Sequence, residues 1–127
     1  MRKSDSSRRD AYSWGVEAET LAALWLRGRF YTILERNFRI RGGEIDIIAR
    51  RGRTVAFVEV KARADLEDAF LAITPQKQRR IALAANRWVA THGWAMDYTL
   101  RGDAIFVARG ALPLHVENAF ELGGGFL

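Results

Sequence analysis

The chain has 127 residues, 49% of them apolar and 11% aromatic, which is enough to bury the core of one compact domain. Its formal net charge is +5, its pI is about 10.2, and 17 of its 20 basic residues are arginine. The planar guanidinium suits phosphate, so the composition favours an anionic partner. The absence of cysteine excludes disulfides and thiolate metal sites, and no apolar run reaches the roughly 18 residues of a membrane span.

The two ends of the chain are expected to lie outside the folded domain. Residues 1–12 are polar and lack the apolar stretch of a signal peptide, so we expect a disordered basic arm on a cytoplasmic protein. A single domain should span residues 13–121, followed by a flexible glycine-rich tail over residues 122–127. The histidines His92 and His115 lie far apart in the sequence, which disfavours a zinc site.

The first elements in chain order are a helix and a strand. Apolar residues at helical spacing predict a helix over Ser13–Leu26, and Gly28 can end it. Phe30–Ile40 follows as a strand whose Tyr31, Ile33 and Phe38 are apolar.

The next two apolar runs predict a β-hairpin. Glu44–Arg50 and Thr54–Arg63 are joined by Gly52-Arg53, a plausible two-residue loop of the Gly-X type. The centre of this loop lies between Gly52 and Arg53, whose numbers sum to 105. Two residues of the strands are therefore expected to pair across the hairpin when their numbers also sum to 105. Asp46 then faces Glu59, with Cβ atoms about 4.5–5.5 Å apart.

Three charged side chains interrupt these apolar strands: Asp46, Glu59 and Lys61. Buried charges are costly unless they are paired or bind something, and two adjacent carboxylates repel by on the order of 3–4 kcal/mol at an effective dielectric constant near 20. A cation between them removes that penalty, so the set can hold Mg²⁺ or Mn²⁺ and activate a water molecule to hydrolyse a phosphodiester. An exposed cluster of ion pairs is the simpler interpretation, although the apolar flanks weigh against it.

The second half of the chain predicts a loop, a helix and two strands. Residues 64–73 should form the loop, and a second helix should run from its N-cap Thr74, with Pro75 in its first turn, to His92. The tail from Ala111 onward should be irregular. The two late strands are expected over Met96–Leu100 and Ala104–Arg109. This order gives an α/β fold with a mixed sheet of about five strands flanked by two main helices.

The hairpin sequences GEIDIIA (Gly43–Ala49) and FVEVKAR (Phe57–Arg63) resemble the YraN family of small bacterial proteins. More distantly, they are similar to archaeal Holliday-junction resolvases and the PD-(D/E)XK nucleases. The resemblance covers roughly Trp14 to Glu121 and implies a restriction-endonuclease-like three-layer core. Three residues depart from the family pattern, and they cast doubt on packing more than on chemistry: Ala18, Ala62 and Gly102.

The resemblance also implies roles for individual side chains. Asp46 and Glu59 would be metal ligands, with the Val60 carbonyl as a further ligand, and Lys61 would polarise the attacking water or the phosphate. Glu19, on the first helix, would complete the catalytic and metal-binding set. A metal-dependent endonuclease acting on DNA, including branched or junction DNA, is therefore expected.

Nucleic-acid contacts are predicted mainly at arginines, with DNA favoured over RNA and no membrane involved. The second helix would add contacts from its N-terminal turns, where free N–H groups favour anions. A junction enzyme would need two active sites, hence a homodimer. A binding module without catalysis and an assembly scaffold remain alternatives, and any one basic cluster can be simply a solvated face. The predicted contacts are Arg36, Arg39, Arg41, Arg50, Arg51, Arg53, Arg63, Gln76, Lys77 and Arg80.

Overall fold

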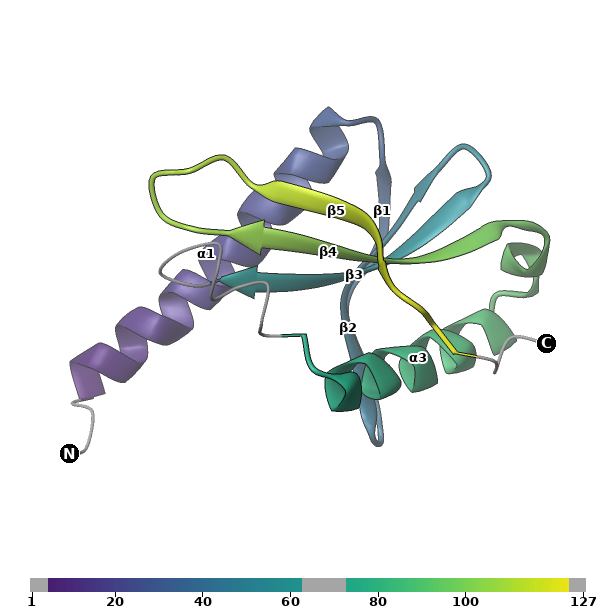
Figure 1. Ribbon diagram of the computed structural model, residues 1–127, viewed down its shortest axis with the longest axis horizontal. Helices are drawn as coiled ribbons and strands as arrows, with labels where there is room; N and C mark the ends of the chain where they lie inside the picture. The colour runs from purple at the N-terminus through teal and green to yellow at the C-terminus, as the bar shows by residue number, and fades with distance from the viewer. Residues whose placement is uncertain (1–4, 63–72, 124–127) are drawn as a thin grey trace.

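The computed structural model describes residues 5–62 and 73–123. One mixed sheet has the strand order β1-β2-β3-β4-β5 (Figure 1). The strands are β1 (Thr32–Ile40), β2 (Gly43–Arg51), β3 (Thr54–Ala62), β4 (Thr99–Val107) and β5 (Leu114–Phe120). The helices are α1 (Asp5–Gly28), α3 (Pro75–Ala90) and the short 3-10 helix η1 (Gly93–Asp97). The predicted α/β class, with five strands and two main helices, is confirmed.

The two long helices cover opposite faces of the sheet. Alternate residues of β3 enter different cores, with Phe57 packing on the α3 side and Val58 on the α1 side. Trp88 of α3 packs edge-on against Phe57, and Leu26 of α1 is fully buried in the other core. The sheet therefore forms the middle of three layers. No helix in the described part of the chain is both long and apolar enough to cross a membrane.

The hairpin of β2 and β3 has the predicted register. Ile47 pairs with Val58 and Ile48 with Phe57, so paired numbers sum to 105. Gly52 has a φ of 59°, a left-handed conformation that glycine adopts without steric cost. The turn residue thus fixes which side chains of the two strands share a face.

Helix α1 begins at Asp5, earlier than the expected start at Ser13. Residues 5–12, predicted to be a disordered arm, are therefore helical. The segment has no glycine or proline to end a helix, and its Asp5-Ser6 start has the residue types that favour helix N-termini. The polar composition concealed this extension, because no apolar periodicity marks it.

The end of the chain differs most from expectation. A single strand, β4, runs through Gly102 and Asp103, where a turn between two strands was predicted, and it pairs in parallel with all of β3. The tail from Ala111, expected to be irregular, contains β5. Leu122, assigned to a flexible tail, is 8% exposed and packs in the α3-side core. The total of five strands was right although two of the strands were misplaced.

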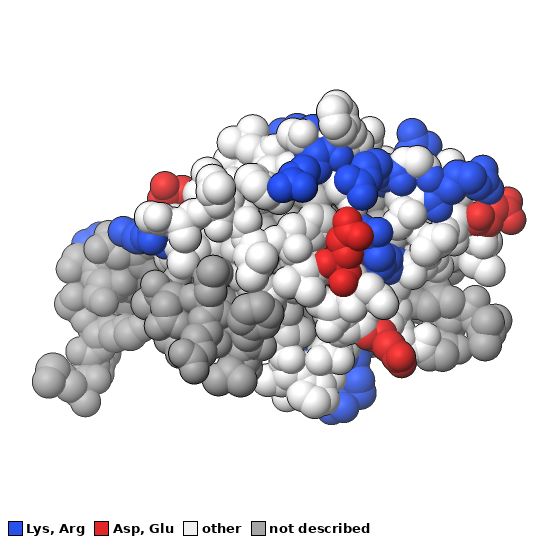
Figure 2. Space-filling model, turned by 45° about the horizontal axis from the view of Figure 1, so that its top comes forward, with Lys and Arg blue, Asp and Glu red and all other residues white. Residues whose placement is uncertain are grey.

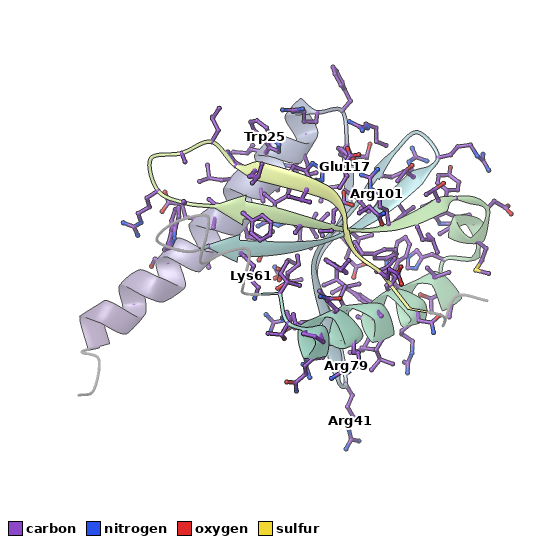
Figure 3. All side chains as sticks on the ribbon, viewed as in Figure 1. Trp25, Arg41, Lys61, Arg79, Arg101 and Glu117 are labelled. Atoms are coloured by element: carbon purple, nitrogen blue, oxygen red, sulfur yellow. The ribbon has the colours of Figure 1, made fainter. Side chains whose placement is uncertain are left out.

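Asp103 of β4 links this strand to β5 through side-chain contacts. Its carboxylate is fully buried and accepts hydrogen bonds from Arg101 Nε (2.7 Å), Arg101 Nη2 (2.8 Å) and the Asn118 N–H (3.0 Å), and His115 Nε2 lies 2.8 Å from Oδ2. Burial opposes the charge, but these partners outweigh it and lower the pKa of Asp103. Figure 3 shows Arg101 close to Glu117 of β5, to which it forms an ion pair of 3.5 Å. The apparent turn signal is thus a buried junction between strands.

Candidate functional site

Strand β2 leaves β3 at Asp46. The ladder between the two strands ends at Ile47 and Val58, one step before Asp46 would face Glu59. Ile45 packs in the α3-side core and Ile47 in the α1-side core, so the regular alternation of side chains is interrupted between them. Beyond this point β2 curves toward α3 (Figure 1). The divergence opens the sheet next to the two carboxylates.

The Asp46 side chain replaces the missing backbone partner of β3. Its Oδ2 accepts a hydrogen bond of 2.8 Å from the Val60 N–H, a group that the departing strand no longer pairs. Burial raises the pKa of the Asp46 carboxyl, and this hydrogen bond offsets the effect only in part. Asp46 is therefore fixed in orientation at the place where the strands separate.

Glu59 is a buried carboxylate with an uneven set of partners. It is 2% exposed, and its Oε1 lies 3.3 Å from Lys61 Nζ and 3.6 Å from Lys77 Nζ. Its Oε2 is buried and has no hydrogen-bond partner among the described residues. Burial and the nearby charge of Asp46 raise the pKa of Glu59 to about 7, against the pull of the two lysines. One oxygen thus contacts both lysines, while the other is buried without a hydrogen bond to any described residue, an arrangement that calls for an explanation.

The first turn of α3 brings Lys77 to the site. Thr74 caps the helix as predicted, with its hydroxyl accepting from the Lys77 N–H at 3.2 Å. Lys77 Nζ donates to Glu44 Oε1 at 2.7 Å. Burial opposes the ammonium charge, but this bond and the neighbouring carboxylates raise the pKa of Lys77. The ammonium group thus stays charged between Glu44 and Glu59.

Glu44 is a site residue that no signal in the sequence marks. The bond from Lys77 lowers the pKa of Glu44, with smaller contributions from Arg39 and Arg80. Its position at the start of β2 suggests a solvated strand end, and no local pattern reports a partner 33 residues away. Only the packing of α3 on the β1–β2 hairpin creates the pair.

A pocket of about 590 Å³ opens beside these residues. Three of the predicted catalytic residues line it, each from a different element: Glu19 from α1, Asp46 from β2 and Lys61 from β3. Figure 3 shows Lys61 near the end of β3. Glu59 lies behind the wall and contacts Lys61. The fold therefore brings Glu19, Asp46 and Lys61 to one pocket, with Glu59 buried next to Lys61.

Glu19 is held apart from the two central carboxylates. Its Oε1 forms an ion pair with Arg36 Nη2 at 3.3 Å, across the pocket from α1 to β1. In the described part of the chain, no group of three or more Asp, Glu, His or Cys side chains is close enough to hold one metal ion. As placed here, Glu19 is a pocket wall residue paired with arginine.

The predicted nucleic-acid contacts lie in three places. Arg36 and Arg39 line the pocket, Lys77 lies at the carboxylates, and Gln76 and Arg80 are exposed on the first turns of α3. The remaining ones lie elsewhere. Arg41 extends from the tip of the β1–β2 hairpin (Figure 3). Arg50, Arg51 and Arg53 lie at the opposite end of β2 and β3 from Asp46 and Glu59, and Arg63 is outside the described residues.

The arginines of the β2–β3 hairpin, predicted as nucleic-acid contacts, do not lie beside the pocket. Six strand positions separate Asp46 from Gly52, a span of about 20 Å at 3.3 Å per residue. Adjacency in the sequence was mistaken for adjacency in space, because an extended strand carries its two ends far apart. The pocket and the turn are two separate basic regions.

The residues of the site fit a hard divalent cation. Mg²⁺ is usually bound by one or two carboxylates and retains several waters, so Asp46 and Glu59 are sufficient ligands and a third carboxylate is not required. The unpartnered Glu59 Oε2 is the observation that favours a cation, since a buried oxygen without a partner is otherwise destabilising. The donor set contains only oxygen, which matches the preference of Mg²⁺ and Mn²⁺.

Comparisons with known proteins identify relatives over nearly the whole chain. A family model described as "Uncharacterised protein family UPF0102" matches residues 18–107. The chain belongs to this family. A UPF0102 protein of Methylocella silvestris is 57% identical over 125 residues, covering 98% of this chain and 100% of that protein. One from Methylorubrum populi is 52% identical, covering 91% of this chain and 92% of its own, and one from Bradyrhizobium diazoefficiens is 48% identical, covering 87% and 84%.

Membership confirms the resemblance to the YraN family, which is the same family as UPF0102. The matched segment contains α1 from Ala18 onward, the β2–β3 hairpin, α3 and β4. Asp46, Glu59, Lys61 and Lys77 therefore lie inside the region that the family model describes.

Proposed function

We propose that this UPF0102 protein is a metal-dependent nuclease that hydrolyses phosphodiester bonds, with DNA, including branched DNA, as its preferred substrate. The observation that carries the proposal is the Asp46–Glu59 pair at the divergence of β2 and β3, where one Glu59 oxygen contacts two lysines and the other is buried without a hydrogen-bond partner among the described residues. Perturbed carboxylates beside a pocket are typical of catalytic sites.

Asp46, Glu59 and the Val60 carbonyl would hold the cation. When bound, Mg²⁺ or Mn²⁺ would lower the pKa of a water molecule and polarise a phosphoryl oxygen. Lys61, which lines the pocket, supplies positive charge that a phosphate there would meet, and Lys77 adds charge beside Glu59. Arg36 and Arg39 line the same pocket and would position the flanking backbone phosphates.

The Asp46→Asn variant separates catalysis from binding. The amide keeps the shape of the side chain and an oxygen to accept the Val60 N–H, but removes one negative charge and a metal ligand. We expect cleavage to fall by at least about 100-fold, as when a transition-state interaction is lost, while DNA binding stays equal to or stronger than that of the parent. The assay is a Mn²⁺-dependent cleavage screen over branched, single-stranded and duplex DNA and RNA.

Asp97→Asn is the matched control. Asp97 is exposed at the far end of the molecule, so the variant makes the same charge change without touching the pocket. Cleavage that survives in Asp46→Asn as well as in Asp97→Asn would contradict the proposal. Retained binding by both proteins, with no cleavage by the parent on any substrate, would favour a binding module on a nuclease-like fold.

A further inference from the structure

A second basic surface lies around the β2–β3 turn, away from the pocket. We call it the turn edge and define it by Arg29, Phe30, Arg51 and Arg53, all of which are exposed. The turn and the C-terminal end of α1 lie together at the top of Figure 1, the side that comes forward in Figure 2, where basic side chains form a band along the upper margin. Arg51 Nη1 donates to the Arg29 carbonyl at 3.2 Å, so the turn and the helix end are joined directly.

The arginines of the turn edge are ordered before any ligand binds. Each guanidinium carbon lies over an aromatic ring, a cation–π contact that restricts the side chain. Less side-chain freedom is then lost when a phosphate binds. One acidic group competes, since Glu117 lies 3.4 Å from Arg51. The stacked pairs are Arg29 over Trp25 (4.5 Å), Arg51 over Tyr31 (4.5 Å) and Arg53 over Tyr98 (4.9 Å).

Phe30 stands among these arginines with its ring in solvent. It is 86% exposed and has a φ of 72°, a left-handed conformation that is strained for a bulky side chain. Hydrogen bonds from the Phe30 N–H to Arg27 O (3.1 Å) and from the Tyr31 N–H to Leu26 O (3.0 Å) hold the backbone in place. A strained, exposed aromatic ring beside phosphate-binding groups is suited to stacking on an unpaired base.

We propose that the turn edge binds a single-stranded stretch of nucleic acid, with phosphates on the stacked arginines and an unpaired base on Phe30. The inference rests on the proposed function for the class of partner, nucleic acid, and does not require cleavage. The turn lies about 20 Å from Asp46, which is the length of roughly six nucleotides at the 3.4 Å spacing of a duplex strand and is therefore an upper limit for an extended unpaired strand. The surface would thus select substrates with an unpaired segment at that distance from the cleaved bond.

Phe30→Gly is a sharp test because glycine suits the positive φ and should fold at least as well as the parent. Binding is measured by fluorescence anisotropy with a labelled oligothymidylate of about twelve nucleotides and a duplex of equal length, in the presence of a metal chelator. We expect Phe30→Gly to weaken single-strand binding roughly 5- to 100-fold, the value of one stacked base, and to leave duplex binding within about twofold. Phe30→Tyr should retain the affinity.

The charge contribution is tested with Arg53→Ala against Arg87→Ala, which removes the same charge from the outer face of α3. Arg53→Ala should weaken single-strand binding and reduce its salt dependence, and Arg87→Ala should do so much less. Equal effects of these two variants, no effect of Phe30→Gly, or an equal loss on duplex would each overturn the inference. Binding to phosphatidylglycerol vesicles that depends on Phe30, with none to oligonucleotides, would assign the surface to a membrane instead.

This experiment and the cleavage screen fail independently. If the parent protein cleaves nucleic acid but Phe30→Gly binds the single strand as well as the parent does, only the turn-edge proposal is contradicted. If Phe30→Gly weakens single-strand binding but the parent protein cleaves no substrate, only the nuclease proposal is contradicted.

Discussion

At the residue scale, Glu59 combines burial with a neighbouring carboxylate. Both features favour the protonated form, and together they outweigh the attraction of Lys61 and Lys77. The two lysines contact the same oxygen, so the charge of the second oxygen is not compensated by any described hydrogen bond. In the absence of a cation, Glu59 is consequently protonated at a higher pH than an ordinary glutamate.

This electrostatic balance predicts how stability depends on pH. Glu59 has a pKa of about 7 in the folded protein and an ordinary value of 4.5, so between these values the folded state binds more protons than the unfolded state. The free energy of unfolding should therefore fall as pH rises from about 4.5 to about 7, by up to on the order of 3 kcal/mol. Urea unfolding at pH 5 and pH 8, with a chelator present, measures the fall.

The Asp46→Asn variant provides the comparison. Without the Asp46 charge the pKa of Glu59 should move down, so the decline in stability should be smaller than in the parent. Mg²⁺ should restore stability to the parent at pH 8 more than at pH 5, because protonated carboxylates do not bind it. The lowered pKa values of Glu44 and Asp103 give stability that is lost only at more acidic pH, below this window. Equal pH profiles in parent and variant would show that the two carboxylates do not interact.

The amino-acid sequence predicts the central residues of the site but not the residues around them. Asp46, Glu59 and Lys61 stand out because charges are rare within apolar strands, and the Gly52 turn sets the register of the strand pairs up to Ile47 and Val58, next to them. Glu44 carried no such signal, because its charge is ordinary for a strand end. Its partner arrives through tertiary packing, which no local spacing encodes.

At the element scale, the placement of α3 depends on a glycine in β2. A Cβ atom at Gly43 would lie 2.6 Å from the Arg80 carbonyl oxygen and 3.1 Å from the Ala84 nitrogen, both backbone atoms of α3. The β1–β2 hairpin can therefore approach the helix closely only without a side chain there. This contact sets where Lys77 lies, three residues before Arg80 on the same helix.

Gly43→Ala should displace α3 and disturb the site at the same time. We expect a loss of roughly 1–3 kcal/mol in the free energy of unfolding, the usual cost of overpacking, together with weaker binding of DNA. Gly93→Ala is the control, because a Cβ atom there meets nothing within 4 Å. Chemical denaturation and DNA titration of both variants check this. A Gly43→Ala protein with parental stability would mean that the helix shifts without cost.

The late strands illustrate why an element can escape prediction. Glycine followed by aspartate is typical of turns, so the sequence at Gly102-Asp103 predicts a break between two strands. In the fold, the glycine makes room for Phe120, whose ring and carbonyl would lie 2.7 Å from an added Cβ atom. The aspartate is buried because Arg101, His115 and Asn118 satisfy it. Contacts with β5 account for both the glycine and the aspartate. Because β5 lies more than ten residues further along the chain, no local sequence pattern predicts these contacts.

At the scale of the whole molecule, basic charge is divided between two ends of one sheet. The pocket end mixes arginine with carboxylates, while the turn edge is mainly cationic. The overall charge of +5 gave the expectation of a polyanionic partner, but composition has no information about position. The length of the paired part of β2 and β3 determines the distance between the pocket and the turn edge. This distance in turn sets the length of substrate that can contact both.

The parallel pairing of β3 and β4 also has a consequence for how the chain folds. Strands β1, β2 and β3 are joined by short hairpins, whereas Thr54 pairs with Thr99 and Ala62 with Val107, 45 residues apart in each case. Closing so long a loop costs entropy before any contact repays it, so the three-stranded meander should form first and the β4–β5 pair should dock late. We expect Ala49→Gly in β2 to slow refolding and Phe120→Leu in β5 mainly to accelerate unfolding, as measured by stopped-flow chevron plots. The reverse pattern would place the nucleus in the C-terminal strands, and the completed β3–β4 pair would then be an early event.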